Sequence, residues 1–388
     1  MIRSVLALAL LAPASAFACG GFFCNGITPI QQEAERILFE VQPDDTITAT
    51  VEVQYSGQPA DFSWIVPVPR GFDASQVGIG DPELFNALEK STAPTFFREG
   101  EVETWTVTDG GVATEVETWD TINGGWSCSG STGSRRVRSV EIEYSPETER
   151  EETIEHPDEV VVDANLASST DVGPYEAQVI AAATGADLLA WLTEAGYAVP
   201  DEAAARAEPY IAANMSFLAL RLQPTAAEGA LAPIILKYDG SVPAIPLVLT
   251  GVAAADDMEV VVYVAAQDLY EPDNFARIDD YPFDDVEIAG WGGTNYGVIL
   301  RDEIEDRQGR AFITEYANES GAPDFLGGLP YLTRMRTFIG PDAMTVDPGF
   351  RGGGGFVSNF HELPPRLEDA SIPWWLILAA VGVRRRQR

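Results

Sequence analysis

The feature of this sequence that most constrains its fold is a series of short segments in which β-branched and aromatic residues alternate with polar ones. Residues 46–55 read TITATVEVQY before the turn residues SGQP, and residues 62–69 read FSWIVPVP and end in prolines. A period of two places alternate side chains on opposite faces of a strand. Five more segments predict strands: 171–180, 217–222, 234–238, 245–252 and 258–265.

Two segments carry helix signals instead. Residues 81–90 begin with Asp81 as a cap and Pro82 in the first turn, and residues 187–196 are amphipathic and end at Gly196. Strands therefore outnumber helices. The expected fold class is α+β and predominantly β, with antiparallel sheets or a meander and a few short helices.

A short internal echo adds to the strand content. VETW stands at 102–105 and again at 116–119, and each copy leads into a glycine turn. This pattern predicts a β-meander in which Trp105 and Trp119 pack across the sheet, with stacking on a sugar or another ligand as the alternative.

The N-terminal end has the three parts of a secretion signal. A basic residue, Arg3, precedes an apolar run over 5–12, and the small residues Ala16 and Ala18 stand just before Cys19. We expect residues 1–18 to be a signal peptide that is cleaved after Ala18. Lipidation of Cys19 is an alternative, although Ala16 stands where lipoprotein signals usually carry a leucine-like residue.

The C-terminal end has the character of a membrane-directed tail. The apolar residues 372–383 include Trp374 and Trp375, and four arginines follow within 384–388. As a helix this segment covers about 18 Å, which is short of the ~30 Å hydrocarbon core. We therefore expect a marginal membrane anchor or a sorting tag read by export machinery. The expected location is the periplasm or the cell surface.

Charge excludes one large class of partner. The chain has 60 acidic and 24 basic residues and a net charge of −36, so its surface repels phosphate backbones and nucleic-acid binding is not expected.

The length of the chain suits one large domain or two. We expect a β-rich half over 19–150, an α+β half over 151–345, and a Gly/Pro-rich spacer over 346–371 before the tail at 372–388.

Cysteines and acidic residues supply the candidate bonds and ligands. Outside the reducing cytosol, Cys19 and Cys24 are expected to form a disulfide, with Cys24–Cys128 as the alternative. Oxygen ligands in a loop suit Ca²⁺, so the acidic cluster over 279–285 is a candidate calcium site; because its spacing matches no EF-hand loop, a solvated loop is the favoured alternative. Its candidate ligands are Asp279, Asp280, Asp284 and Asp285.

Motifs for catalysis are missing. The two histidines, His156 and His361, stand in a charged linker and in the spacer, and the chain has no G-x-S-x-G, H-E-x-x-H or G-x-x-x-x-G-K-[ST] motif. No catalytic residue, no cofactor-binding residue and no cofactor other than calcium is predicted.

Several segments, in order, resemble the bacterial family named only as domain of unknown function 2330 (DUF2330), and the resemblance covers residues 19–340. Clear matches are CGGFFC at 19–24, FSWIVPVP at 62–69, VGPYE at 172–176 and GRAFITEYA at 309–317. The resemblance implies an exported, often envelope-associated protein, and it supplies no activity or site residues.

Three functions follow from the sequence. The leading prediction is a non-enzymatic structural or binding protein of the cell envelope, with a protein or glycan partner that the sequence does not identify. The first alternative is a secreted hydrolase that uses carboxylates on polysaccharide or peptide. The second is a calcium-stabilised adhesion module.

Overall fold

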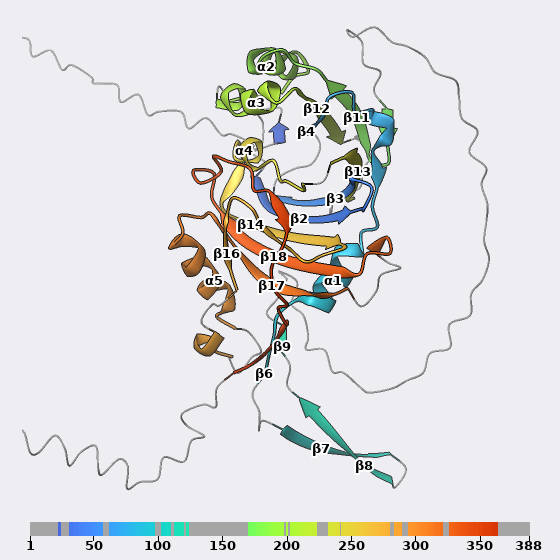
Figure 1. Ribbon diagram of the computed structural model, residues 1–388, viewed down its shortest axis with the longest axis vertical. Helices are drawn as coiled ribbons and strands as arrows, with labels where there is room; N and C mark the ends of the chain where they lie inside the picture. The colour runs from blue at the N-terminus through green and yellow to red at the C-terminus, as the bar shows by residue number, and fades with distance from the viewer. Residues whose placement is uncertain are drawn as a thin grey trace, which may run out of the picture.

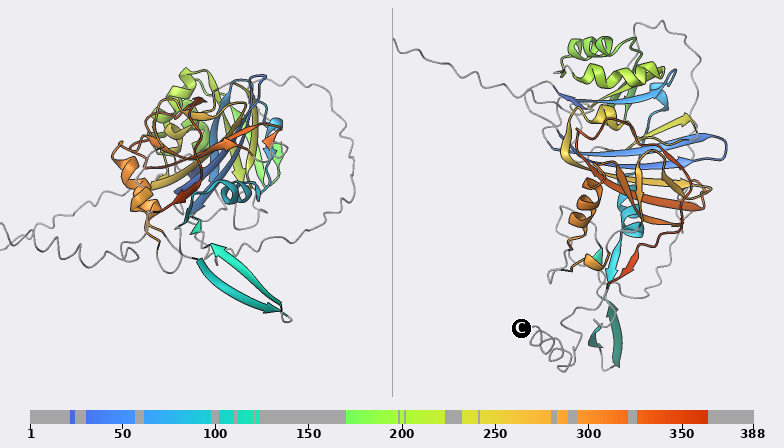
Figure 2. Two further views of the ribbon diagram at one scale, coloured as in Figure 1. Left: turned by 60° about the horizontal axis from the view of Figure 1, so that its bottom comes forward. Right: turned by 60° about the vertical axis from the view of Figure 1, so that its left-hand side comes forward.

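The computed structural model of the chain describes the following residues: 22–24, 31–56, 62–97, 102–109, 112–119, 122–123, 170–197, 199–200, 202–222, 232–240, 242–279, 283–288, 294–320 and 326–363. Two β-sheets lie face to face, and helices cover the outer face of each sheet, so the body has four layers (Figures 1 and 2). Strands outnumber helices among these residues, which confirms the expected α+β, predominantly β class.

The larger sheet has eight strands and a mixed topology. Its β14–β2 and β16–β17 pairs are parallel, and its other pairs are antiparallel. In order across the sheet the strands are β16 (Ala276–Ile278), β17 (Ala311–Glu319), β18 (Tyr331–Ile339), β14 (Ala254–Ala266), β2 (Gln31–Val41), β3 (Thr46–Ser56), β13 (Ile234–Asp239) and β5 (Gly78–Ile79).

The smaller sheet has five strands, and all of its pairs are antiparallel. In order the strands are β1 (Phe22–Cys24), β4 (Phe62–Pro69), β12 (Met215–Leu222), β11 (Tyr175–Ile180) and β10 (Thr170–Val172).

The main hydrophobic core fills the space between the two sheets. Alternate residues of β2, Ile37, Phe39 and Val41, belong to this core together with Val66 and Leu218 of the smaller sheet. The period-two pattern read from the sequence is therefore the pattern that builds the sandwich.

Helices bury the outer faces of both sheets. The helices α2 (Gly185–Glu194) and α3 (Glu202–Ala212) pack on the smaller sheet, while α1 (Leu84–Thr92) and α5 (Tyr296–Glu305) pack on the larger one. A one-turn helix, α4 (Leu247–Thr250), precedes β14.

Short strands complete the described secondary structure. They are β15 (Tyr270–Pro272) with β19 (Phe350–Gly352), β20 (Phe360–Glu362) with β6 (Thr95–Phe97) and β9 (Ile122–Asn123), and the hairpin β7 (Val102–Asp109) with β8 (Val112–Trp119). In the hairpin Trp105 pairs with Val116 and Trp119 with Val102, so the two tryptophans are not direct cross-strand partners. Two 3-10 turns span Ala74–Gln76 and Phe283–Asp285.

The structure corrects three predicted elements. The segment 171–180 is a hairpin, because Gly173 adopts a φ of 54° and Pro174 follows it. The segment 245–252 holds the one-turn helix α4 instead of a strand, since a short buried apolar run does not distinguish the two. The first helix begins at Leu84, with Asp81 in the turn before it.

The sequence halves interleave in the fold. Both sheets combine strands from 19–150 with strands from 151–345, so the two halves share one core. Residues 346–363, within the predicted spacer, contribute β19 and β20, and Phe350 is buried in the core between the sheets. The predicted signal peptide (1–18), the predicted C-terminal tail (372–388) and His156 lie outside the described residues. None of the described helices combines the length and apolar character that crossing a bilayer requires.

Candidate functional site

Two arginines in the middle of β18 organise the outer face of the larger sheet. Arg334 and Arg336 are two residues apart, so they point to the same face, and the side chain of Arg334 is fully buried. A bulge in β17 adds Glu315 opposite them, because the pairing with β18 shifts between Thr314 and Tyr316.

These residues form a buried network of ion pairs. Glu315 lies 2.6 Å from Arg334 Nε and 3.1 Å from Arg336 Nε, and it accepts a 2.8 Å hydrogen bond from the Tyr296 hydroxyl. Glu89 of α1 lies 2.8 Å from Arg334 Nη2, and Glu259 lies 3.0 Å from Arg336 Nη1. The network therefore ties α1 and α5 to the sheet.

The electrostatics of this network suit structure better than proton transfer. Burial opposes ionisation of Glu89, but the nearby Arg334 and Arg336 outweigh it and lower the pKa of Glu89 to about 2. Burial raises the pKa of Tyr263, whose hydroxyl donates to Glu89. At neutral pH the Glu89 carboxylate and the Tyr263 hydroxyl keep fixed protonation states. The role that suits the network is therefore to hold the helices against the sheet.

A second buried carboxyl lies in the core between the sheets. Glu35 of β2 is only 4% exposed, and Gln32 Nε2 donates to it at 3.1 Å. Burial outweighs this hydrogen bond and raises the pKa of Glu35 to about 7. Its position among core side chains keeps it away from the surface.

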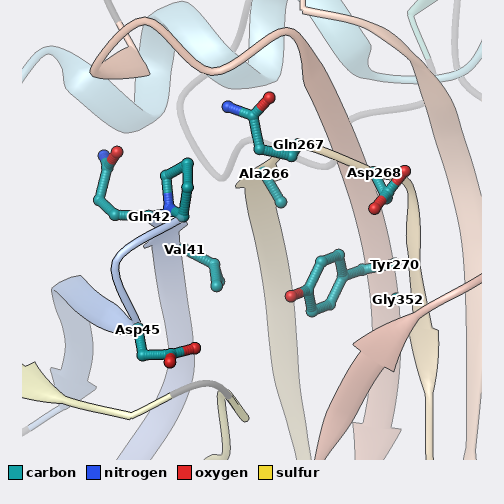
Figure 3. A pocket seen from close by; sticks show the side chains of 9 residues that line it. Val41, Gln42, Asp45, Ala266, Gln267, Asp268, Tyr270 and Gly352 are labelled. Carbon is teal, nitrogen blue, oxygen red and sulfur yellow. The ribbon is translucent and has the colours of Figure 1, made fainter.

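One end of the larger sheet carries a groove, which we call the end groove. A pocket of about 180 Å³ lies between the β2–β3 turn and the loop after β14, and the side chains of Asp45 and Tyr270 extend into the space between these elements (Figure 3). A neighbouring pocket of about 480 Å³ shares Asp268 and Gly352 with the first, so the two are adjacent. The second pocket is also lined by Leu269, Tyr331, Gly353, Gly354 and Phe356.

Backbone hydrogen bonds hold the walls of the end groove in place. Gly353 donates to the carbonyl of Leu269 at 2.7 Å, and the amide of Tyr270 donates to Thr333 Oγ1 at 3.1 Å. Val357 and Ala317 exchange two hydrogen bonds of 2.8 and 2.9 Å, which positions Phe356 beside Tyr331. The two rings have centroids 6.4 Å apart and planes tilted by 55°.

The charge around the end groove is negative. Burial and then the charge of Asp268 raise the pKa of Tyr270. Two arginines beside the groove are paired with carboxylates: Arg277, whose Nη1 lies against Gly354, pairs with Glu271 and Asp279, and Arg351 pairs with Glu271 and Asp273. A positively charged group therefore meets carboxylate charge that is not already neutralised.

The glycine loop between β19 and Phe356 gives a first prediction. Gly354 has a φ of 94°, and a Cβ there would stand 2.5 Å from Arg277 Nη1, whereas a Cβ on Gly355 would meet nothing within 4 Å. Gly354→Ala should therefore lower the free energy of unfolding by about 1–3 kcal/mol. Gly355→Ala is the matched control and should change it by less than about 0.5 kcal/mol. Urea denaturation measures both, and equal effects would contradict the strain at Gly354.

The predicted calcium ligands are only partly described. Asp279 lies 2.5 Å from Arg277 Nε, and Asp284 and Asp285 are exposed in a 3-10 turn, while Asp280 lies outside the described residues. Among the residues that the structure describes, no group of three or more metal-ligating side chains occurs. Calcium binding by this cluster stays a prediction.

The predicted disulfide cannot be followed in the described part of the chain. Outside it lie Cys19, Cys128 and the side chain of Cys24.

His361 occupies an aromatic cluster. Its ring stacks on Phe283 at 4.0 Å and lies 5.4 Å from Phe96. Burial lowers its pKa to about 4 against an opposing effect from Glu315, so the imidazole is neutral at physiological pH. These ring contacts indicate that His361 contributes to the packing of this cluster.

Sequence reasoning missed both the ion-pair network and the end groove. The signal for the network is visible afterwards in TRMRTFI at 333–339, where two arginines alternate within a strand-like segment. The residues of the end groove are far apart in the sequence and carry no shared local motif.

Comparison with known proteins supplies a family. Residues 13–314 match the family described as uncharacterized protein conserved in bacteria (DUF2330), which confirms the resemblance found from the sequence. No curated protein and no solved structure matches the chain. Because the match covers most of its length, this chain belongs to the DUF2330 family of bacterial proteins.

Proposed function

We propose that this chain is an exported protein of the bacterial cell envelope with a non-enzymatic binding role, and that its ligand occupies the end groove. The observation that carries the binding role is the gathering of Asp45, Asp268, Tyr270, Tyr331 and Phe356 along two adjacent pockets. Pockets that combine aromatic side chains with a few polar groups are the usual sites of small ligands. The signal-like start and the basic tail of the sequence support the location.

The arrangement of buried carboxyl groups favours binding over hydrolysis. A carboxylate hydrolase needs two acids that flank one substrate position. Burial raises the pKa of Glu35, Glu40 and Asp347, but these belong to the core between the sheets, the outer face of the larger sheet and the contact with α4. Glu315 already forms ion pairs with the guanidinium groups of Arg334 and Arg336, which does not suit a catalytic acid.

The location is tested by fractionation of the native cells. We expect the protein in the envelope fraction, with a mature N-terminus at Cys19 by mass spectrometry of the intact chain. The same spectrum reports lipid on Cys19 and removal of the tail. Protein that remains in the cytosol with residues 1–18 attached would contradict export.

The binding role is tested by thermal denaturation of the mature chain with a panel of sugars, peptides and small organic ions. At saturating concentration a ligand of the end groove should raise Tm by several degrees. Phe356→Ala should remove that shift. A panel in which no compound gives a shift that depends on Phe356 would contradict the proposed site.

A further inference from the structure

We infer that the aromatic end of the end groove, the pocket around Tyr331 and Phe356, binds a small organic cation through an alkylated ammonium group. This inference rests on the proposed binding role and names the chemistry of its ligand. Three observations point to it: two aromatic rings, one carboxylate and the lack of a basic residue among the lining residues described.

The two rings form a tilted aromatic pair that lines the pocket. Tyr331 lies at the start of β18 and Phe356 follows the glycine loop, and their planes are tilted by 55° at a centroid separation of 6.4 Å. Phe356 is 68% exposed, so a ligand can reach its ring. Two tilted ring faces on one pocket suit a cation that carries methyl groups, because the face of each ring is negative and apolar together.

The carboxylate of Asp268 completes the site, because Asp268 lines both pockets. Arg277, which lies against Gly354, pairs with Glu271 and Asp279, and Arg351 pairs with Glu271 and Asp273. Among the described ion pairs neither arginine engages Asp268, so the cation would gain the two rings and that negative charge.

The same composition disfavours other ligands. A divalent metal ion takes six or more oxygen ligands, or nearly ideal octahedral geometry, and one carboxylate among aromatic rings does not supply this. An anion would face Asp268. A neutral sugar would need several polar side chains to bind its hydroxyl groups, whereas the side chains of the larger pocket are mainly aromatic and aliphatic.

Titration calorimetry with the mature full-length chain tests the inference. The probes are choline and 3,3-dimethylbutan-1-ol, which has the same shape without the charge. We expect choline to bind about tenfold more tightly than the neutral compound. Phe356→Ala and Asp268→Asn should each weaken choline binding about fivefold. Phe360→Ala and Asp239→Asn, at exposed positions elsewhere, should leave it unchanged.

The source of the ammonium group is separated by a second arm with phosphatidylcholine vesicles. Binding of free choline that depends on Phe356 supports the inference for a soluble ligand, and vesicle binding with the same dependence supports it for a lipid headgroup. Equal affinity for the two small probes, or no choline binding, would overturn the inference. The proposed binding role would survive that result if another compound of the panel gave a shift that Phe356→Ala removes.

Discussion

Arg334→Met should lower the free energy of unfolding by about 3–5 kcal/mol, which is a large share of the stability of an ordinary domain. Arg334 is fully buried, and its guanidinium lies against Glu315 at 2.6 Å and Glu89 at 2.8 Å. Methionine fills similar space but leaves Glu315, also fully buried, with Arg336 as its remaining cation. The cost is mainly the desolvated negative charge left behind.

Urea denaturation at pH 7 measures this effect, and Arg351→Met is the control. Arg351 also contacts two carboxylates, but its side chain is 58% exposed, so its loss should cost less than about 1 kcal/mol. If Arg334→Met prevents folding, Glu89→Gln tests the same network from its partly exposed side and should be less destabilising. Similar losses of unfolding free energy for Arg334→Met and Arg351→Met would contradict the stabilising role of the buried ion-pair network.

Glu35→Gln should change how stability depends on pH. The carboxyl of Glu35 has a pKa of about 7 in the folded protein against 4.5 ordinarily, so the folded state holds its proton more tightly. The stabilising effect is complete below pH 4.5 and is lost as pH rises through 7. A shift of this size corresponds to about 3 kcal/mol. Glutamine keeps a neutral side chain at every pH and removes this loss.

Unfolding curves at several pH values between 5 and 8 check this expectation. The stability of Glu35→Gln relative to the natural chain should rise with pH, by about 3 kcal/mol across the full titration. Glu33→Gln is the matched control, because Glu33 is an exposed residue of the same strand and should give curves parallel to those of the natural chain. Parallel curves for Glu35→Gln as well would show that Glu35 is ionised in the folded protein.

Local patterns predicted much of the sandwich. The strands β3, β4 and β14 were expected from alternation or from β-branched content, and α2 from its amphipathic pattern and Gly196. Local sequence patterns did not predict a strand whose charged residues depend on partners from other parts of the fold. Residues 333–339 carry two arginines and form an interior strand of the sheet, where Glu315, Glu89 and Glu259 pair with them.

The end groove shows a different limit. Asp45 follows β2, and Asp268 follows β14, more than 200 residues later. The parallel pairing of β2 with β14 brings these two strand ends to one side of the sheet. Phe356 then joins them through the bridge between Val357 and Ala317. No local signal contains this arrangement, because it depends on the order of strands across the sheet.

The most direct test of the central claim, that the end groove is a binding site, is fluorine NMR of the mature chain labelled with fluorophenylalanine. The Phe356 resonance is assigned with Phe356→Leu and the Phe360 resonance with Phe360→Leu. We predict that choline shifts the Phe356 resonance in a saturable way and leaves that of Phe360 in place. A Phe356 resonance that stays unmoved by choline and by every compound of the ligand panel would contradict the account.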